Sequence, residues 1–292
     1  MSSRGNHTIA ILNVPEDHEK LAIVLRDIIA EVETLTSISI NDQKFEIEYF
    51  LCSDLKFLEI VCGIEAANST YACVCCKCPA AERYNMEKQS STSEAEHGAR
   101  SVTEITECCN KPKKQRFNCA HPPLFSTIPI SHVVPDVLHL FLRVTDVLLN
   151  LLILEIRRLD GIERNSSGYD ELNKHTTLES FINDTCQIPF KFFINKESKQ
   201  LTWHDLMGPE KLVFFEKVNL PALIPQLPNV EKTQALWRDF FYLHKRLQRK
   251  SFTKTEAECF GENAKQWVKD FTSIYQTTHV TPYIHVLAIA CF

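Results

Sequence analysis

Two neighbouring sets of side chains have the types and spacing that metal chemistry requires. Asp54 follows an alternating segment, 43–52, that predicts a β-strand, and a carboxylate at a strand end is a usual position for a ligand of a catalytic divalent cation. Further along, Cys73 and Cys76 have the Cys-x-x-Cys spacing with which one tight turn supplies two zinc ligands. The sequence therefore predicts a structural zinc site beside a candidate catalytic edge.

The cysteine segment allows more than one set of ligands. Cys75 and Cys78 form a second, overlapping Cys-x-x-Cys frame, and alternate residues of an extended segment point to opposite sides. The remaining zinc ligands must therefore come from elsewhere in the chain. The candidates are Cys108 with Cys109, Cys119 with His121, or His285. Buried thiols that hold no metal are the alternative for this whole group of cysteines.

Asp54 and His139 also have ordinary structural explanations. Asp54 would cap a helix beginning near Leu55, because an aspartate there accepts hydrogen bonds from free backbone N–H groups. His139 lies in a mostly apolar helical segment, where a histidine is usually a hydrogen-bonded core residue. A two-metal site needs several convergent carboxylates, and the local sequence places only Asp54.

The elements that would position Asp54 alternate between strand and helix. Residues 7–13 predict a short strand, the apolar spacing from Leu21 to Val32 predicts an amphipathic helix, and residues 43–52 predict the next strand. This order predicts an α/β crossover with the two strands parallel. Asp54 would then lie at the carboxyl edge of the sheet, where such folds place their chemistry.

The rest of the chain predicts a polar segment followed by helices. Residues 82–115 are polar and poor in aromatic side chains, which predicts a mobile loop or insertion. A long apolar helix is predicted from Asp136 to Arg158, and we expect it to be buried rather than to span a membrane, because charged and polar side chains interrupt it. The other predicted elements are helices at about 168–185, 208–215, 233–248 and 254–275, and a hairpin at 191–203.

Composition limits the class of protein. The 292 residues are 44% hydrophobic, enough for one large core or two small ones. Twelve cysteines, in a chain whose first residues do not resemble a signal peptide, predict reduced thiols and metal binding rather than disulfides. A net charge of −5 gives no general attraction for nucleic acid, and the seven scattered glycines form no phosphate-binding loop.

Several segments together resemble the catalytic core of the V(D)J recombination-activating recombinase and its Transib-type transposase relatives. The matching stretches occur in the same order over almost the whole chain and are sparse between about 80 and 125. They are His7-Thr-Ile-Ala-Ile-Leu12, Asp17 to Leu25, the strand to Asp54, Tyr71 to Cys76, Asp136-Val-Leu-His139 and Tyr283-Ile-His285. The interval from Asp54 to Cys73 is the most specific part of the resemblance.

The resemblance implies both a fold and an activity. The family has an RNase H-like α/β sheet whose Asp-Asp-Glu triad holds Mg²⁺ or Mn²⁺ for DNA cleavage and strand transfer, and Asp54 would be one triad member. It also implies a structural Zn²⁺ held by Cys73, Cys76 and His285, which selects the first of the two cysteine frames. We expect DNA to be the partner of the intact family, with weak or no DNA binding by this chain alone. A nuclear or otherwise cytoplasmic location without membrane association or secretion, and a homodimer, are the other expectations.

The chain also departs from the family pattern. No convincing counterpart of the first catalytic aspartate precedes Asp54, and the catalytic glutamate would fall beyond Phe292. Ala290 stands where the second zinc histidine is expected, with Cys291 as a substitute and His139 as a further accessory candidate. A lone carboxylate cannot hold two cations, so we expect catalytic inactivity.

The resulting expectation is an α/β protein truncated at both ends, with a mostly helical zinc-binding insertion. Residues 1–70 would form an incomplete RNase H-like sheet, residues 71–125 a Cys-rich zinc-binding segment with a mobile loop, and residues 126–292 a mostly helical region. The alternative is a domesticated zinc-binding interaction or scaffold protein without nuclease activity.

Overall fold

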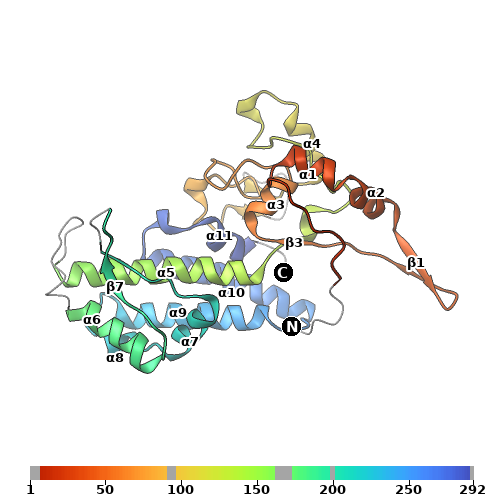
Figure 1. Ribbon diagram of the computed structural model, residues 1–292. Coiled ribbons are helices and arrows are strands. Elements are labelled where there is room, and N and C mark those ends of the chain that lie inside the picture. The colour runs from red at the N-terminus through yellow and green to blue at the C-terminus, as the bar shows by residue number, and fades with distance from the viewer. Residues whose placement is uncertain (1–6, 91–96, 162–172, 198–200, 290–292) are drawn as a thin grey trace. The chain divides into compact units, whose positions relative to one another are not determined.

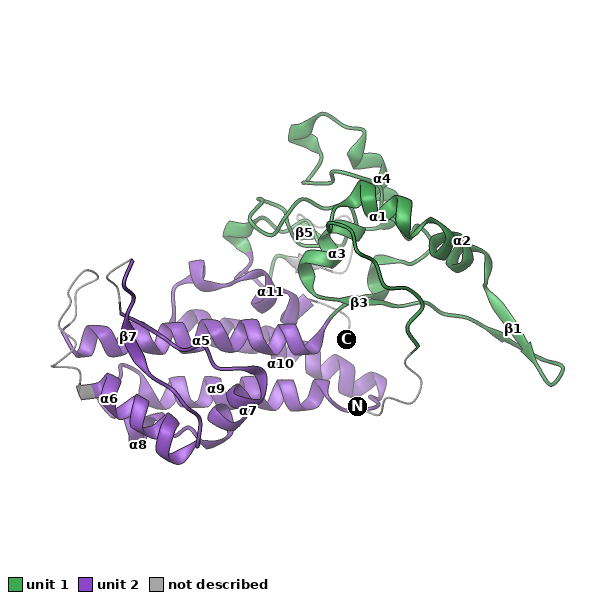
Figure 2. Ribbon diagram, in the orientation of Figure 1, with its two compact units in different colours: residues 1–82, 87–135, 291 green, residues 83–86, 136–290, 292 purple. Residues whose placement is uncertain are grey.

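The contacts within the chain divide it into two compact units. A computed structural model describes residues 7–90, 97–161, 173–197 and 201–289 (Figure 1). The first unit comprises the described parts of residues 1–82 and 87–135, and the second comprises residues 83–86 and the described parts of 136–290 (Figure 2). Each unit is described separately below.

The first unit begins with two short helices and a hairpin. Helix α1 (His18–Val24) starts at Asp17, whose side chain accepts a hydrogen bond from the Lys20 amide, and α2 (Arg26–Thr34) follows. Strands β1 (Ser37–Ile40) and β2 (Gln43–Glu46) then pair antiparallel, with Asn41 and Asp42 in the left-handed region at the turn. The predicted single strand 43–52 is therefore wrong, and residues 7–13 form no strand.

A short parallel pair of strands lies beside α3 in the first unit. Strand β3 (Leu51–Ser53) pairs with β6 (Val133–Pro135), and the register places Ser53 opposite Pro135. Helix α3 (Leu55–Val61) begins directly after β3. A parallel pair at Asp54 was expected, but its second strand comes from far along the chain instead of from residues 7–13. Three-residue strands have too little local pattern to reveal such a partner.

The predicted loop at 82–115 contains more structure than its composition indicates. Helix α4 (Val102–Cys109) starts at Ser101, whose hydroxyl accepts a hydrogen bond from the Glu104 amide, and it buries Ile105 and Cys108. The other elements between α3 and α5 are η1 (Ala80–Glu82), β4 (Gln89–Ser90) paired parallel with β5 (His97–Gly98), η2 (Lys113–Gln115) and η3 (Ile130–His132). The loop prediction is wrong for the residues of α4, and residues 91–96 lie outside the described part.

The second unit is a helical assembly around α5 (Val137–Leu159), as predicted. The other helices are α6 (Asn173–Ser180), which continues into a π-helical turn (Phe181–Thr185), α7 (Gly208–Lys217), α8 (Leu220–Leu223), α9 (Val230–Leu247), α10 (Lys254–Ile274), η5 (Thr277–His279) and α11 (Pro282–Ile289). Strands β7 (Phe192–Ile194) and β8 (Leu201–Trp203) form the predicted antiparallel hairpin. The predicted start of α6, before residue 173, lies outside the described residues.

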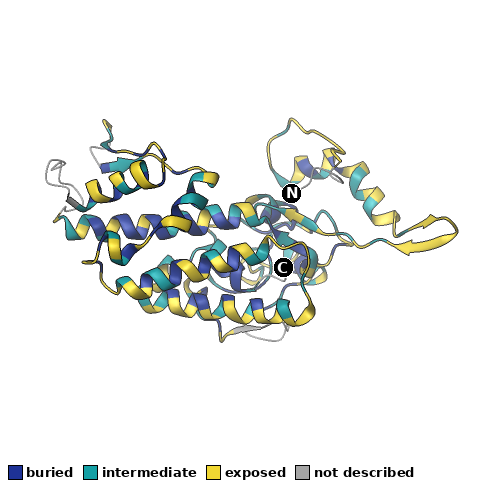
Figure 3. Cartoon of the chain, turned by 90° about the horizontal axis from the view of Figure 1, so that it is seen from below, coloured by how far each residue is buried: buried dark blue, intermediate teal, exposed yellow. Residues whose placement is uncertain are grey.

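Aromatic packing forms the core of the second unit. The Phe215 and Trp237 rings stack at 4.8 Å between centroids, and the Trp267 indole donates a hydrogen bond to the Leu236 carbonyl at 2.8 Å. Figure 3 shows buried residues along the inward faces of the packed helices and exposed residues along their outer faces. By length and composition α5 could cross a membrane, but half of its apolar stretch is buried inside the structure.

The chain is thus a mixed α/β protein in which helix predominates. The sheets of the described residues are four two-stranded pairs. A mixed fold was predicted and is confirmed at this level. The finer assignment, an RNase H-like sheet, stays a prediction.

Candidate metal centre

The cysteine segment is held by the chain around Ala99. Cys76 and Ala99 form an isolated antiparallel bridge, and the Arg100 amide donates a hydrogen bond to the Cys75 carbonyl at 2.9 Å. The Lys77 ammonium forms a salt bridge with Glu104 on α4 at 2.8 Å, with both side chains largely buried. These contacts fix a segment that lies outside the helices and named strands.

The Arg100 side chain is the main internal support of this segment. It is buried, and its Nε donates hydrogen bonds to the carbonyl oxygens of Cys73 and Cys76, at 2.9 and 3.0 Å. One terminal nitrogen donates to the carbonyls of Tyr71 and Phe117, at 2.9 and 2.8 Å. The guanidinium, with five donors in a rigid plane, thus fixes the backbone of both residues of the Cys-x-x-Cys pair.

The other terminal nitrogen of Arg100 contacts a thiol. It lies 3.2 Å from the sulfur of Cys119, which is buried. Burial raises the pKa of Cys119 to about 11, although the neighbouring guanidinium acts in the opposite direction. Cys119 is therefore a protonated, buried thiol at neutral pH, and its contact with Arg100 is structural.

Three candidate ligands converge as the first cysteine frame requires. The Sγ atoms of Cys73 and Cys76 and a ring nitrogen of His285 all lie within 4.8 Å of one another, and all three residues are buried. The searched residues are those that the structure describes, and this is the only group of three or more candidate ligands among them. The group could bind a metal ion such as zinc.

The ring of His285 has a hydrogen-bond partner in the backbone. His285 lies on α11, and its Nδ1 is 3.1 Å from the carbonyl oxygen of Arg83. Because a carbonyl oxygen only accepts hydrogen bonds, Nδ1 must carry the proton, which leaves the lone pair on Nε2. A histidine that donates one ring N–H to a carbonyl and offers the other nitrogen is the usual arrangement of a metal ligand.

The chemistry of the donors fits a structural zinc ion. Two thiols and an imidazole in a buried environment are donors that zinc prefers. The neighbouring thiols of Cys73 and Cys78, together with burial, raise the pKa of Cys76 in the metal-free chain. A bound cation would replace the protons of these thiols, so metal affinity should fall as the pH is lowered.

A tetrahedral ion would need a fourth ligand beyond these three residues. Cys78 is a candidate by its environment, because its thiol is fully buried and interacts with that of Cys76. The local sequence leaves the frame of Cys75 and Cys78 open, and the resemblance selects the other frame. Ala290 and Cys291 lie outside the described residues.

Asp54 has the capping role that was considered as its alternative, whereas His139 is not the core residue that its apolar segment indicates. The Asp54 carboxylate accepts a hydrogen bond from the Phe57 amide at 3.0 Å and caps α3. His139 is half-exposed, and its Nδ1 lies 2.5 Å from the carboxylate of Asp136, which caps α5. Neither Asp54 nor His139 belongs to the candidate ligand group among the described residues.

The other proposed ligand pairs are used differently. His121 stacks on His18 with ring centroids 4.4 Å apart, and the Cys119 thiol contacts Arg100. Cys108 is buried on α4, and the Cys109 thiol donates to the Ile105 carbonyl at 3.0 Å. Arg100 itself was missed, because it lies in a segment predicted to be mobile. The only sequence signal was a Ser-x-x-Glu capping motif inside this segment, Ser101 to Glu104, directly after Arg100.

Comparison with known proteins adds no assignment to this geometry. No protein-family model matches the chain, and no curated protein matches it.

Proposed function

We propose that this chain is a zinc-stabilised interaction protein in which the metal ion has a structural role. The observation that carries the proposal is the buried convergence of Cys73, Cys76 and His285. Burial favours a structural site, because a catalytic zinc ion needs a position open to water or substrate. The supporting contacts of Arg100 and the Arg83 carbonyl orient the ligands without presenting a reactive group.

Exposed apolar side chains in the first unit support the interaction role. Most of the large hydrophobic side chains exposed among the described residues fall between residues 9 and 50. Ile38, Ile40 and Phe45, for example, lie on the β1–β2 hairpin with 41%, 52% and 43% exposure. Ile38 lies opposite Phe45 in the strand register, so these side chains are neighbours, and contiguous exposed apolar surface is a mark of protein interaction sites.

The test of the structural role is removal of the metal. The purified chain is treated with a chelator, and thermal unfolding is followed before treatment and after addition of Zn²⁺ or Mg²⁺. We expect the unfolding midpoint to fall on chelation and to recover with Zn²⁺ alone, because thiol and imidazole donors discriminate against Mg²⁺. An unchanged midpoint after complete metal removal would show that the site has no structural role.

A second candidate is metal-dependent DNA cleavage and strand transfer of the recombinase type, with Asp54 as a Mg²⁺ or Mn²⁺ ligand. The parallel pairing of β3 with β6 favours it, because it places Asp54 directly after one strand of a parallel pair. The test is nicking of duplex DNA by the purified chain with Mn²⁺ or Mg²⁺. Asp54→Asn is the informative variant, since asparagine keeps the helix cap but removes the ligand charge.

The two candidates predict opposite results in that assay. The interaction protein predicts no cation-dependent nicking by the wild-type chain. Nicking that Asp54→Asn abolishes would instead establish the recombinase-type activity.

A further inference from the structure

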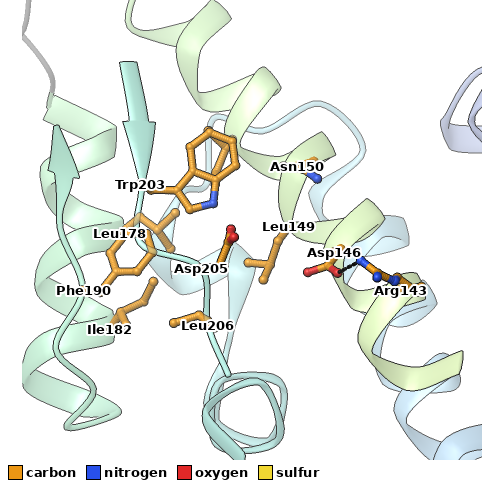
Figure 4. A pocket seen from close by; sticks show the side chains of 11 residues that line it. Arg143, Asp146, Leu149, Asn150, Leu178, Ile182, Phe190, Trp203, Asp205 and Leu206 are labelled. Carbon is orange, nitrogen blue, oxygen red and sulfur yellow. Dashed lines mark ion pairs between the residues drawn. The ribbon is translucent and has the colours of Figure 1, made fainter. Parts of the chain in front are cut away.

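The second unit contains a cavity that the proposed metal centre does not use. Its volume is about 270 Å³, and its walls come from α5, from α6 with the following π-helical turn, and from the chain at the end of β8 (Figure 4). Its floor is apolar and consists of buried side chains. These are Leu149, Ile153, Leu178, Ile182, Phe190 and Leu206. An apolar floor of this kind favours the hydrocarbon part of a ligand.

Polar side chains line the cavity from two directions. Arg143, Asp146 and Asn150 lie on one face of α5, at the spacing of successive turns. Asp205 contributes from the chain that follows β8, beside the half-buried Trp203. Hydrogen-bonding groups thus converge over an apolar floor, which is the composition of a small-ligand site.

The charges on the α5 side are already compensated. Asp146 forms an ion pair with the buried Lys211 and lies 3.9 Å from Arg143. The guanidinium of Arg143 is therefore not a free anion-binding group. An anionic ligand would have to compete with Asp146 and would also approach Asp205.

Asp205 is the uncompensated charge of the cavity. It has no ion-pair partner among the residues described by the structure, and it is exposed. Figure 4 shows its carboxylate in the cavity that Trp203 and Leu149 also line. A carboxylate and an indole ring that line one cavity favour a cation, because the negative face of the ring attracts positive charge as well.

We infer that this cavity binds an organic cation with a short hydrocarbon stem and a terminal ammonium group. The stem lies on the apolar floor, and the ammonium group lies near Asp205 and the Trp203 ring. The volume of about 270 Å³ lies just below the usual range for ligand sites, so the occupant is a free alkylamine or a single lysine side chain.

The test uses pentylamine, whose stem and charge match a lysine side chain. Binding is measured by titration calorimetry and by the shift of the Trp203 indole N–H signal in proton–nitrogen NMR spectra, assigned with a Trp203→Phe variant. We expect saturable binding of pentylamine, and binding of the neutral analogue pentanol that is weaker by about tenfold, the effect of one charge-assisted contact.

The decisive variant is Asp205→Asn, which removes the charge with almost no change in shape. We expect it to weaken pentylamine binding by about tenfold and to leave pentanol binding unchanged. Asp184→Asn is the matched control, because Asp184 is exposed in the π-helical turn of the same unit and does not line the cavity. This control should bind pentylamine like the wild-type chain.

Two peptide ligands distinguish the sources of the ammonium group. A short peptide with one lysine and the same peptide with acetyllysine are titrated alongside pentylamine. Binding of the lysine peptide but not of the acetylated one identifies a protein side chain as the occupant, and binding of pentylamine alone identifies a free amine. The inference is overturned if neither amine source binds, if pentanol binds as tightly as pentylamine, or if Asp205→Asn has no effect.

Discussion

Arg100 is the single side chain on which the geometry of the cysteine segment depends most. Its guanidinium contacts the carbonyls of Cys73, Cys76, Tyr71 and Phe117 and the sulfur of Cys119 while it is itself buried. No carboxylate takes part in these contacts. The positive charge is stabilised by carbonyl dipoles, which requires all of them to stay in place.

We therefore expect Arg100→Lys to destabilise the chain strongly, although the substitution conserves the positive charge. A lysine ammonium cannot reproduce the planar set of donors, and several buried carbonyls would lose their partner. The expected loss is about 2–4 kcal/mol in the free energy of unfolding, measured by urea denaturation, together with weaker zinc binding. Arg26→Lys, at an exposed position of α2, is the matched control and should change neither quantity. Wild-type behaviour of Arg100→Lys would contradict the supporting role.

His244 makes the second unit sensitive to acid. It is buried on α9 and stacks on Phe141 with 4.2 Å between ring centroids, and burial lowers its pKa from 6.5 to about 4. The folded state therefore favours the neutral ring, whereas the unfolded chain binds a proton below pH 6.5. The contribution of neutral His244 to the free energy of unfolding is complete above pH 6.5. This contribution is lost as the pH falls towards 4.

The lowered pKa of His244 predicts that the free energy of unfolding falls by about 3 kcal/mol between pH 6.5 and pH 4. Urea denaturation at a series of pH values measures it. The variant His244→Gln should show a pH dependence that is smaller by one bound proton, although other groups such as His175, whose pKa is also lowered by burial, still contribute. An identical pH dependence in the wild type and the variant would show that His244 does not titrate in this way.

At the scale of elements, Gly63 determines how closely two segments of the first unit approach. Its φ is +70°, and its carbonyl accepts hydrogen bonds from the Ala120 and His121 amides, at 2.7 and 3.1 Å. A Cβ atom at this position would lie 1.9 Å from the His121 carbonyl oxygen. Glycine is required here both for the left-handed backbone and for the close contact.

Gly63→Ala should therefore destabilise the chain by about 3 kcal/mol or more, because the backbone of residue 121 cannot move away without breaking these hydrogen bonds. The measurement is the midpoint of thermal unfolding. Gly261→Ala is an informative control, since Gly261 lies inside α10 with open space around it. This substitution should stabilise the chain by about 0.5–1 kcal/mol. Equal effects of the two substitutions would contradict the packing argument.

The long helices could be predicted from the sequence, but the short strands could not. Helices α5, α9 and α10 repeat apolar side chains over many turns, so their signal is strong, and their predicted bounds lie within a few residues of the observed ones. Strand β3 has three residues, and its partner β6 lies far along the chain. Its pairing depends on tertiary packing that no local pattern records.

At the scale of the whole molecule, the candidate metal centre was predictable only in part. The spacing of the cysteines indicated two overlapping pairs of ligands, whereas the choice of the Cys73 and Cys76 frame, and of His285 among the candidate partners, came from the resemblance to the recombinase family. The role of Arg100 could not be found from the sequence, because it depends on contacts between segments that local composition does not connect.

The central claim is that Cys73, Cys76 and His285 hold a zinc ion. Its most direct test is the metal content of the purified chain by inductively coupled plasma mass spectrometry, compared with that of Cys73→Ser, Cys76→Ser and the control Cys259→Ser, an exposed cysteine of α10. We predict about one zinc ion per wild-type chain and per control chain, and little or none in the other two variants. The claim would be contradicted by zinc-free wild-type protein, or by zinc retained in both the Cys73→Ser and the Cys76→Ser variant.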